Sequence, residues 1–134
     1  MKSPNIVISK LDLQRLDKIL DPLKYPLDLL EALENEIDRA RIVGHKRIQP
    51  NVVTMNSKVH VLDETTSREF VVTLVYPQDA GAADTVSILA PVGTALLGLK
   101  TGQCIEWRTP QCRPLKLKVL EVLYQPEANM DYDL

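Results

Sequence analysis

Two carboxylates stand on either side of a short connection between two predicted helices. Asp21 precedes this connection and Asp28 follows it, with Lys24 and Tyr25 between them. Two carboxylates completed by oxygen ligands from a partner are a common arrangement for Mg²⁺. The same residues also suit helix ends, because an aspartate at the start of a helix lies against the positive end of its dipole. The spacing leaves both interpretations of this predicted tip open.

A cluster of basic residues closes the second predicted helix. Arg39, Arg41, His45, Lys46 and Arg47 lie within nine residues of one another. Concentrated positive charge can form a contact patch for a partner protein or a nucleic acid. Basic residues in the last turn of a helix also stabilise its negative end. Contact patch and helix terminus are both compatible with this pattern.

The other metal-binding and nucleophilic side chains form no catalytic motif. His45, His60, Cys104 and Cys112 lack the spacing of a zinc site, and the chain has no glycine-rich phosphate-binding loop. We therefore predict that the protein is not an enzyme and holds no metal or cofactor. The two cysteines are expected to be reduced thiols.

Length and composition limit the size and the partners of the fold. The chain has 134 residues, which supports one domain with a real core, or one domain with a small appendage. Its net charge of −2 argues against a molecule built as a whole to bind a polyanion. Aromatic residues make up only 4%, too few for a base-stacking surface. Without a signal peptide or a membrane-length apolar run, we expect a cytoplasmic protein with no membrane partner.

Two short helices are predicted to position the tip. Ser9 caps the first helix, which ends near Asp21, and the second begins at Leu27 or Asp28 and ends at Gly44. Apolar residues three and four apart give each helix a narrow seam: Leu13, Leu16 and Leu20, then Leu30, Leu33, Ile37 and Ala40. Matching seams predict an antiparallel hairpin with arms of about 15 Å and about 22 Å. This is a stub rather than a long probe.

The second half of the chain is predicted to be a β-sheet. From Val52 the apolar period changes from helical to two. Strands are expected at 53–61, interrupted by a turn, and at 68–76, 85–89, 105–107 and 115–124. The last strand changes phase midway, so we expect a β-bulge near Val119 and Leu120. A loose tail is expected from Pro126 onward.

The stretch Ser87–Trp107 organises this sheet. Pro91 suits the first position of a helix, and Gly98 suits its end. Between them, apolar residues at helical spacing predict a helix of about two turns. A helix this short is unstable alone in water, so the strands must wrap around it.

This arrangement resembles the bacterial Gre transcript-cleavage factors and, more closely, the Rnk family of nucleoside diphosphate kinase regulators. The resemblance to Gre factors rests on Ser87–Pro91 followed by Ala95–Gly98. The blocks similar to the Rnk family are Val52–Ser57, Thr73–Pro77, Ala90–Gly93, Ala95–Leu99 and Tyr124–Ala128. Together these blocks cover most of residues 52–128.

The resemblance implies an α+β protein with two parts. Residues 1–49 would form the helical hairpin, coiled-coil-like, and residues 50–134 a Gre-type, FKBP-like domain whose antiparallel sheet wraps a short helix. It implies binding to RNA polymerase at the rim of the secondary channel, in competition with Gre factors. The docking residues would be Leu89, Ala90, Pro91 and Val92. Nucleic acid would be contacted at most indirectly, through the polymerase. The link to nucleoside diphosphate kinase follows only from the family's name.

The tip departs from the Gre pattern. Gre factors carry acidic residues at the end of a long coiled coil, where they help to hold a catalytic magnesium ion. Here the arms are short, and Asp21 and Asp28 flank the turn rather than standing together. We therefore expect docking without stimulation of transcript cleavage. The alternatives are a cleavage-stimulating elongation factor, an FKBP-like prolyl isomerase, for which the aromatic residues are too few, and a DNA-binding module.

Overall fold

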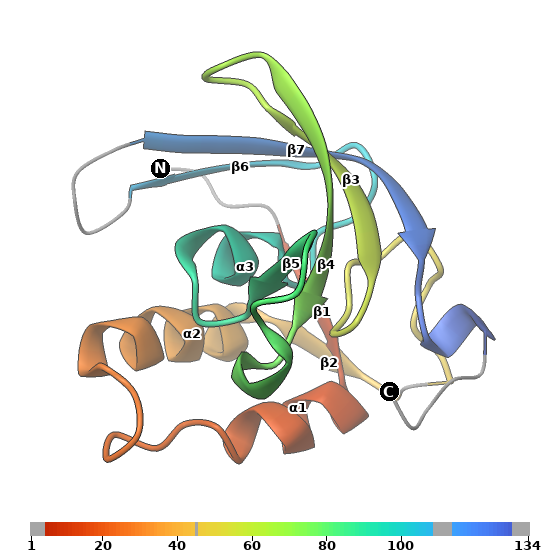
Figure 1. The fold of residues 1–134 in the computed structure, drawn as a ribbon. Coiled ribbons are helices and arrows are strands. Elements are labelled where there is room, and N and C mark those ends of the chain that lie inside the picture. Colours follow the sequence, from red (N-terminus) through yellow and green to blue (C-terminus); the bar gives the residue numbers. More distant parts are fainter. Residues whose placement is uncertain (1–4, 45, 109–113, 130–134) are drawn as a thin grey trace.

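The computed structural model describes residues 5–44, 46–108 and 114–129, which form an α+β fold (Figure 1). The first elements are β1 (Val7–Ser9), α1 (Lys10–Asp17), α2 (Leu27–Arg39) and β2 (Arg41–Val43). They are followed by β3 (Lys58–Asp63), β4 (Arg68–Val75), the 3₁₀ turn η1 (Pro77–Asp79), β5 (Thr85–Ser87), α3 (Pro91–Leu96), β6 (Cys104–Arg108), β7 (Pro114–Tyr124) and the 3₁₀ turn η2 (Glu127–Asn129).

Five strands form a mixed, curled sheet in the order β5-β4-β3-β7-β6. β3 pairs antiparallel with β4 and β7, and β6 pairs antiparallel with β7. β5 runs parallel to β4, because the connection 76–84, which contains η1, carries the chain back before Thr85. The prediction of a purely antiparallel sheet is therefore wrong at this edge.

β7 is irregular where its hydrophobic pattern changes phase. Val61 of β3 pairs with Val119, whereas the preceding residue of β3 pairs with Glu121, which leaves Leu120 as an extra residue. Val119 is fully buried before this point, and Val122 packs against the core after it. The predicted bulge is confirmed, and it lets both halves of the strand face one core.

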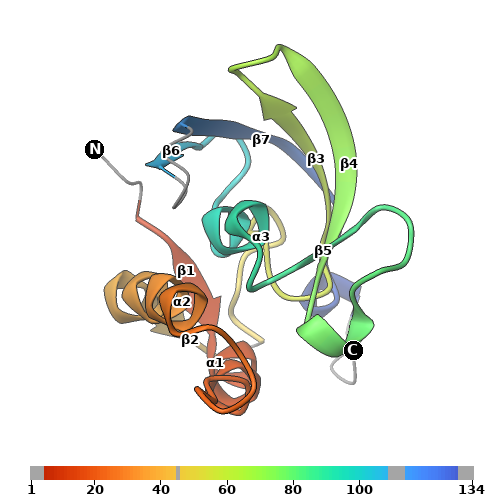
Figure 2. The same ribbon diagram turned by 60° about the vertical axis from the view of Figure 1, so that its left-hand side comes forward.

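The short helix α3 lies inside the curl of the sheet (Figure 2). Pro91 occupies its first position, and Gly98 follows it with a φ of +80°. Leu96 and Leu99 are completely buried. The predicted helix is thus confirmed, and it is stabilised by its surroundings rather than by its own length.

Both N-terminal helices are shorter than predicted. α1 ends at Asp17, and its eight residues span about 12 Å. α2 has thirteen residues, about 20 Å, and ends at Arg39 because Ala40 takes an extended conformation. The next residues form β2, parallel to β1, and the Arg41 N–H donates to the Ile6 carbonyl at 2.9 Å. The prediction of helix up to residue 44 is wrong, because the β-branched residues of β2 find a strand partner in β1.

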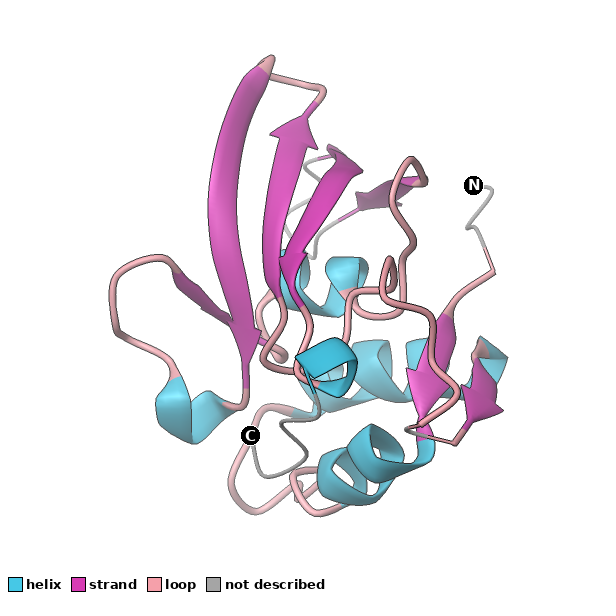
Figure 3. Ribbon diagram, turned by 90° about the vertical axis from the view of Figure 1, so that its right-hand side faces the viewer, coloured by secondary structure: helices cyan, strands magenta, loops and turns pink. Residues whose placement is uncertain are grey.

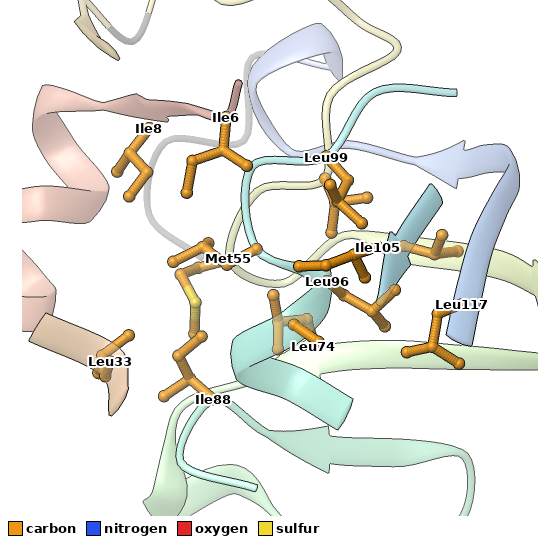
Figure 4. Packing of buried hydrophobic residues seen from close by; sticks show 14 of the residues in the cluster. Ile6, Ile8, Leu33, Met55, Leu74, Ile88, Leu96, Leu99, Ile105 and Leu117 are labelled. Atoms are coloured by element: carbon orange, nitrogen blue, oxygen red, sulfur yellow. The ribbon is translucent and has the colours of Figure 1, made fainter. Parts of the chain in front are cut away.

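The two helices pack against the rest of the protein instead of projecting from it (Figures 1 and 3). Leu16 of α1 and Leu30 and Leu33 of α2 are at most 2% exposed and belong to the same hydrophobic cluster as the sheet residues. Figure 4 shows Leu33 on the side of this cluster that holds Met55 and Ile88. The seams therefore face a common core rather than only each other. The expected projecting stub is wrong.

Gly98 joins β1 to the segment after α3. The Val7 N–H donates to the Gly98 carbonyl at 3.1 Å. A Cβ at Gly98 would lie 2.8 Å from the Ile6 Cβ and 2.9 Å from the Val7 carbonyl oxygen, so a side chain would separate the two segments. The predicted boundary between residues 49 and 50 therefore divides two segments that share one core.

The chain after β7 is anchored as far as it is described. The buried Gln125 donates from Nε2 to the Gln49 and Val52 carbonyls at 2.7 and 2.8 Å. Thr54 Oγ1 donates to Glu127 Oε1 at 2.8 Å. The expectation of a loose tail is wrong for residues 126–129, and residues 130–134 lie outside the described part. Among the helices described, none has the length and apolar character required to cross a membrane.

Candidate functional site

The predicted docking corner joins β5 to α3. Leu89 is only 4% exposed and belongs to the core, whereas Ala90, Pro91 and Val92 are half-buried. Ser87 holds the turn: its Oγ accepts the Leu89 N–H at 3.1 Å, and its carbonyl accepts the Ala90 N–H at 3.0 Å. Three of the four predicted residues thus reach the surface, while Leu89 anchors the corner from inside.

Two residues inside α3 position this corner and were not singled out from the sequence. A Cβ at Gly93 would lie 2.0 Å from the Ser87 carbonyl oxygen, so only glycine lets the helix approach β5 this closely. Thr94 Oγ1 donates to the Ile88 carbonyl at 2.6 Å and lies 3.2 Å from the Ala90 carbonyl oxygen. A glycine and a hydroxyl residue inside so short a helix are the signals that indicate this role.

The predicted tip is a hydrogen-bonded turn. Asp21 Oδ1 accepts the Leu23 N–H at 3.0 Å, and the Asp21 carbonyl accepts the N–H groups of Lys24 and Tyr25 at 3.0 and 3.1 Å. Asp28 lies exposed in the first turn of α2. Each aspartate therefore fits a local structural role.

The tip also contacts the body of the protein. Lys24 and Tyr25 line a pocket of about 290 Å³ together with Arg15, Lys18, Ile19, Tyr76 and Gln78. Leu23 at the apex remains 95% exposed. The end of the connection therefore lies beside η1, which follows Tyr76, rather than at the end of a free arm.

No described cluster of three or more His, Cys, Asp or Glu side chains is arranged to hold a metal ion. His60 Nε2 lies 3.0 Å from Glu69 Oε1 on the neighbouring strand. Cys104 is an exposed free thiol, and partial burial and the nearby Glu64 raise its pKa. Cys112 and His45 lie outside the described residues.

The predicted basic patch is divided by the end of α2. Arg39 stays on the helix and forms a two-point ion pair with Glu36, with Nη2 donating to Oε1 at 3.0 Å. Arg41 lies on β2, and Arg47 on the turn that follows; both line a pocket together with Lys100. Lys46 is exposed but does not line that pocket. Lys100 was not predicted, because it comes from the segment after α3.

A buried acid links α1 to the sheet. The Asp12 N–H donates to Ser9 Oγ at 3.1 Å, which confirms the predicted cap. The Asp12 carboxylate is 3% exposed and accepts the Met55 N–H at 3.0 Å through Oδ2. Burial, with the nearby Glu127 charge adding to it, raises the pKa of Asp12 to about 7, while the Met55 hydrogen bond and the Arg15 charge oppose the rise. The capping pattern gave no signal that Asp12 is buried.

Two family models match the chain. The model "Transcription elongation factor, GreA/GreB, C-term" matches residues 46–124, and the model "Rnk N-terminus" matches residues 4–43. The docking corner lies within the first of these segments and the tip within the second.

Curated relatives and a solved structure agree with these matches. The "Regulator of nucleoside diphosphate kinase" of Escherichia coli strain K12 is 42% identical over 134 residues, covering 98% of both chains. The "Transcription elongation factor GreA" of Acetivibrio thermocellus is 35% identical over 91 residues, covering 67% of this chain and 57% of that protein. The structure titled "Prokaryotic transcription elongation factor GreA/GreB from Nitrosomonas europaea" is 46% identical, covers 91% of this chain and all of its own, and superimposes with a TM-score of 0.70. The chain therefore belongs to the Rnk family of nucleoside diphosphate kinase regulators, which is related to the GreA/GreB elongation factors.

Proposed function

We propose that this protein is a non-catalytic transcription regulator that binds RNA polymerase near its secondary channel. The observation that supports this most strongly is the docking corner, Ala90–Val92. It is partly exposed, it is held in one conformation by Ser87, Gly93 and Thr94, and it lies in the segment that matches the GreA/GreB C-terminal model. A rigid surface loses little conformational entropy on binding, which favours its use as a contact site.

We further propose that the protein competes with Gre factors by occupying the rim. Both kinds of protein would present the same C-terminal module, so only one could dock at a time. The sequence predicted a projecting stub, but α1 and α2 pack against the body. The competition we propose therefore needs only the corner and the surface around it, with residues 50–134 supplying the contact.

Transcript-cleavage stimulation is not part of this proposal. α2 spans about 20 Å, and the two tip aspartates take part in a turn and in a helix start. Such an arrangement gives the tip neither the reach nor a paired carboxylate site for a distant reaction centre. The FKBP-like description of residues 50–134, the absence of a cofactor and the cytoplasmic location stay predictions from the sequence.

A binding assay with core RNA polymerase tests the proposal. We expect the natural protein to bind, and Ala90→Glu to weaken binding about tenfold or more, since it places a charge in the middle of the contact. Ala82→Glu is the matched control: Ala82 is exposed in the loop before β5, which extends away from α3 (Figure 2). Equal binding by the two variants would contradict the assignment of the corner. Competition is tested by displacement of a labelled GreA, and shortening of RNA in a stalled complex with Mg²⁺ would contradict the lack of cleavage stimulation.

A further inference from the structure

Two adjoining pockets form a cationic groove between β1, β2 and the turn after α3. The first has a volume of about 160 Å³ and the second of about 430 Å³, and both are lined by Val7, Arg41 and Lys100. The first pocket is completed by Val43, Arg47, Ile48, Gln49 and Val52. The second is completed by Asn5, Ile6, Arg39, Ala40 and Gln103.

Charge is strongly segregated in this groove. Arg41, Arg47 and Lys100 come from three separate segments and converge on the first pocket, whereas Arg39, which lines the second, is paired with Glu36. The chain carries 18 Asp and Glu residues and a net charge of −2, yet among the residues that the structure describes no acidic side chain lines either pocket. Positive groups gathered in a concave surface without nearby lining carboxylates attract a small anion.

The three cationic segments are held in place by hydrogen bonds from their backbone N–H groups. The Arg41 N–H donates to the Ile6 carbonyl at 2.9 Å, and the Arg47 N–H donates to the Gly44 carbonyl at 2.9 Å. The Lys100 N–H donates to Gln103 Oε1 at 2.9 Å, and Lys100 forms an antiparallel bridge with Val52. The side chains therefore start from fixed positions, which lowers the entropy lost when they bind a ligand.

Four apolar residues line the first pocket beside its cations, and we refer to them as its floor. Val7 and Val43 come from the β1–β2 ribbon, and the buried Ile48 and Val52 come from the segment before β3. A free inorganic anion would leave this floor unused. A ligand with a flat, weakly polar ring next to its anionic group would cover the floor while its charges face the cations.

We propose that the cationic groove binds a nucleoside polyphosphate. Its base lies on the valine and isoleucine floor, and its phosphates lie between Arg41, Arg47 and Lys100. Guanidinium groups pair with phosphate oxygens at two points, and a lysine ammonium adds a compact positive charge. The groove confines its cations to one small concavity on a protein of net negative charge, which favours a small ligand over a long polyanion.

Titration of the ¹⁵N-labelled full chain with ATP, followed by amide chemical shifts, tests this proposal. We expect saturable shifts confined to the segments that line the groove, residues 5–7, 39–43, 47–52 and 100–103. Arg41→Ala and Lys100→Ala should each weaken binding about tenfold. Arg68→Ala is the matched control, because Arg68 is an exposed arginine at the far end of β4 and should leave the affinity unchanged. The spectra themselves show whether each variant is folded.

Three further probes separate the parts of the ligand. Triphosphate and adenosine should each bind more weakly than ATP, because each lacks one half of the contacts. If triphosphate binds as tightly as ATP, the proposed contact between the base and the floor is wrong. If adenosine binds as tightly as ATP, the proposed contact between the phosphates and the cations is wrong. A short RNA that binds the same residues more tightly than ATP would overturn the choice of a small ligand. Equal affinities of Arg41→Ala and Arg68→Ala, or no saturable shift with millimolar ATP, would overturn the site.

Discussion

Replacing Asp12 by asparagine removes a charge that the fold buries. Asp12 lies at the start of α1, is 3% exposed and accepts the Met55 N–H. The charged groups around it are Glu127 on η2 and Arg15 on α1, and the Tyr76 hydroxyl also lies within the reach of its charge. Burial, with Glu127 adding to it, raises the pKa of Asp12 from 3.8 to about 7. Between about pH 4 and pH 7, the native protein therefore keeps a proton on Asp12 that the unfolded chain has already released.

The size of the effect follows from this shift. About 3 pKa units correspond to about 4 kcal/mol of free energy. Because the folded-state pKa is the higher one, this stabilisation is complete below a pH of about 4 and is lost as the pH rises through about 7. Asparagine is neutral at every pH, and its side-chain oxygen can still accept the Met55 N–H. We expect Asp12→Asn to raise the free energy of unfolding at pH 8 by about 2–4 kcal/mol and to change it little at pH 4.

Urea unfolding followed by circular dichroism, at several pH values from 4 to 8, measures this difference. Asp17→Asn is the matched control, since Asp17 is the exposed aspartate at the other end of α1. Its unfolding curve should stay close to that of the natural chain, because the charge it removes is already in water. The reasoning is refuted if Asp12→Asn is destabilised at pH 8, or if its stability and that of the natural chain change with pH in parallel.

Three other substitutions and reactions test the remaining structural claims. Gly93→Ala should lower the free energy of unfolding by about 3 kcal/mol or more, measured by urea unfolding, because the new methyl group meets a fixed backbone carbonyl of β5. Gly98→Ala should lower it by about 1–3 kcal/mol and expose the β1 amides to hydrogen exchange, since its φ is positive and the methyl would touch Ile6. Cys104, whose pKa is raised by partial burial and by Glu64, should react with iodoacetamide at pH 8 more slowly than free cysteine, and an equal rate at this residue would contradict the raised pKa.

Local patterns predicted much of the sheet half of the protein, but they missed the parallel pairing of β5, and β3 begins at Lys58 rather than at residue 53. Pro91 begins α3 and Gly98 follows its end, as expected. Both signals are local, because a proline at the first position and a left-handed glycine after the last turn affect only a few neighbouring residues. The change of phase in the last strand predicted the extra residue at Leu120. The docking corner stays a prediction from the sequence; Leu89 is buried in the core, whereas Ala90, Pro91 and Val92 reach the surface.

The tertiary structure alone decided how the N-terminal residues are used. The apolar seams of α1 and α2 were visible in the sequence, but a seam does not specify which surface covers it. In the folded protein both seams are covered by the core that they share with the sheet. Residues 41–43 became a strand because β1 offered a partner. Lys100 joined Arg41 only through the pairing of the segment after α3 with Val52. The burial of Asp12 likewise depends on a segment 43 residues away, and no local pattern carries information over that distance.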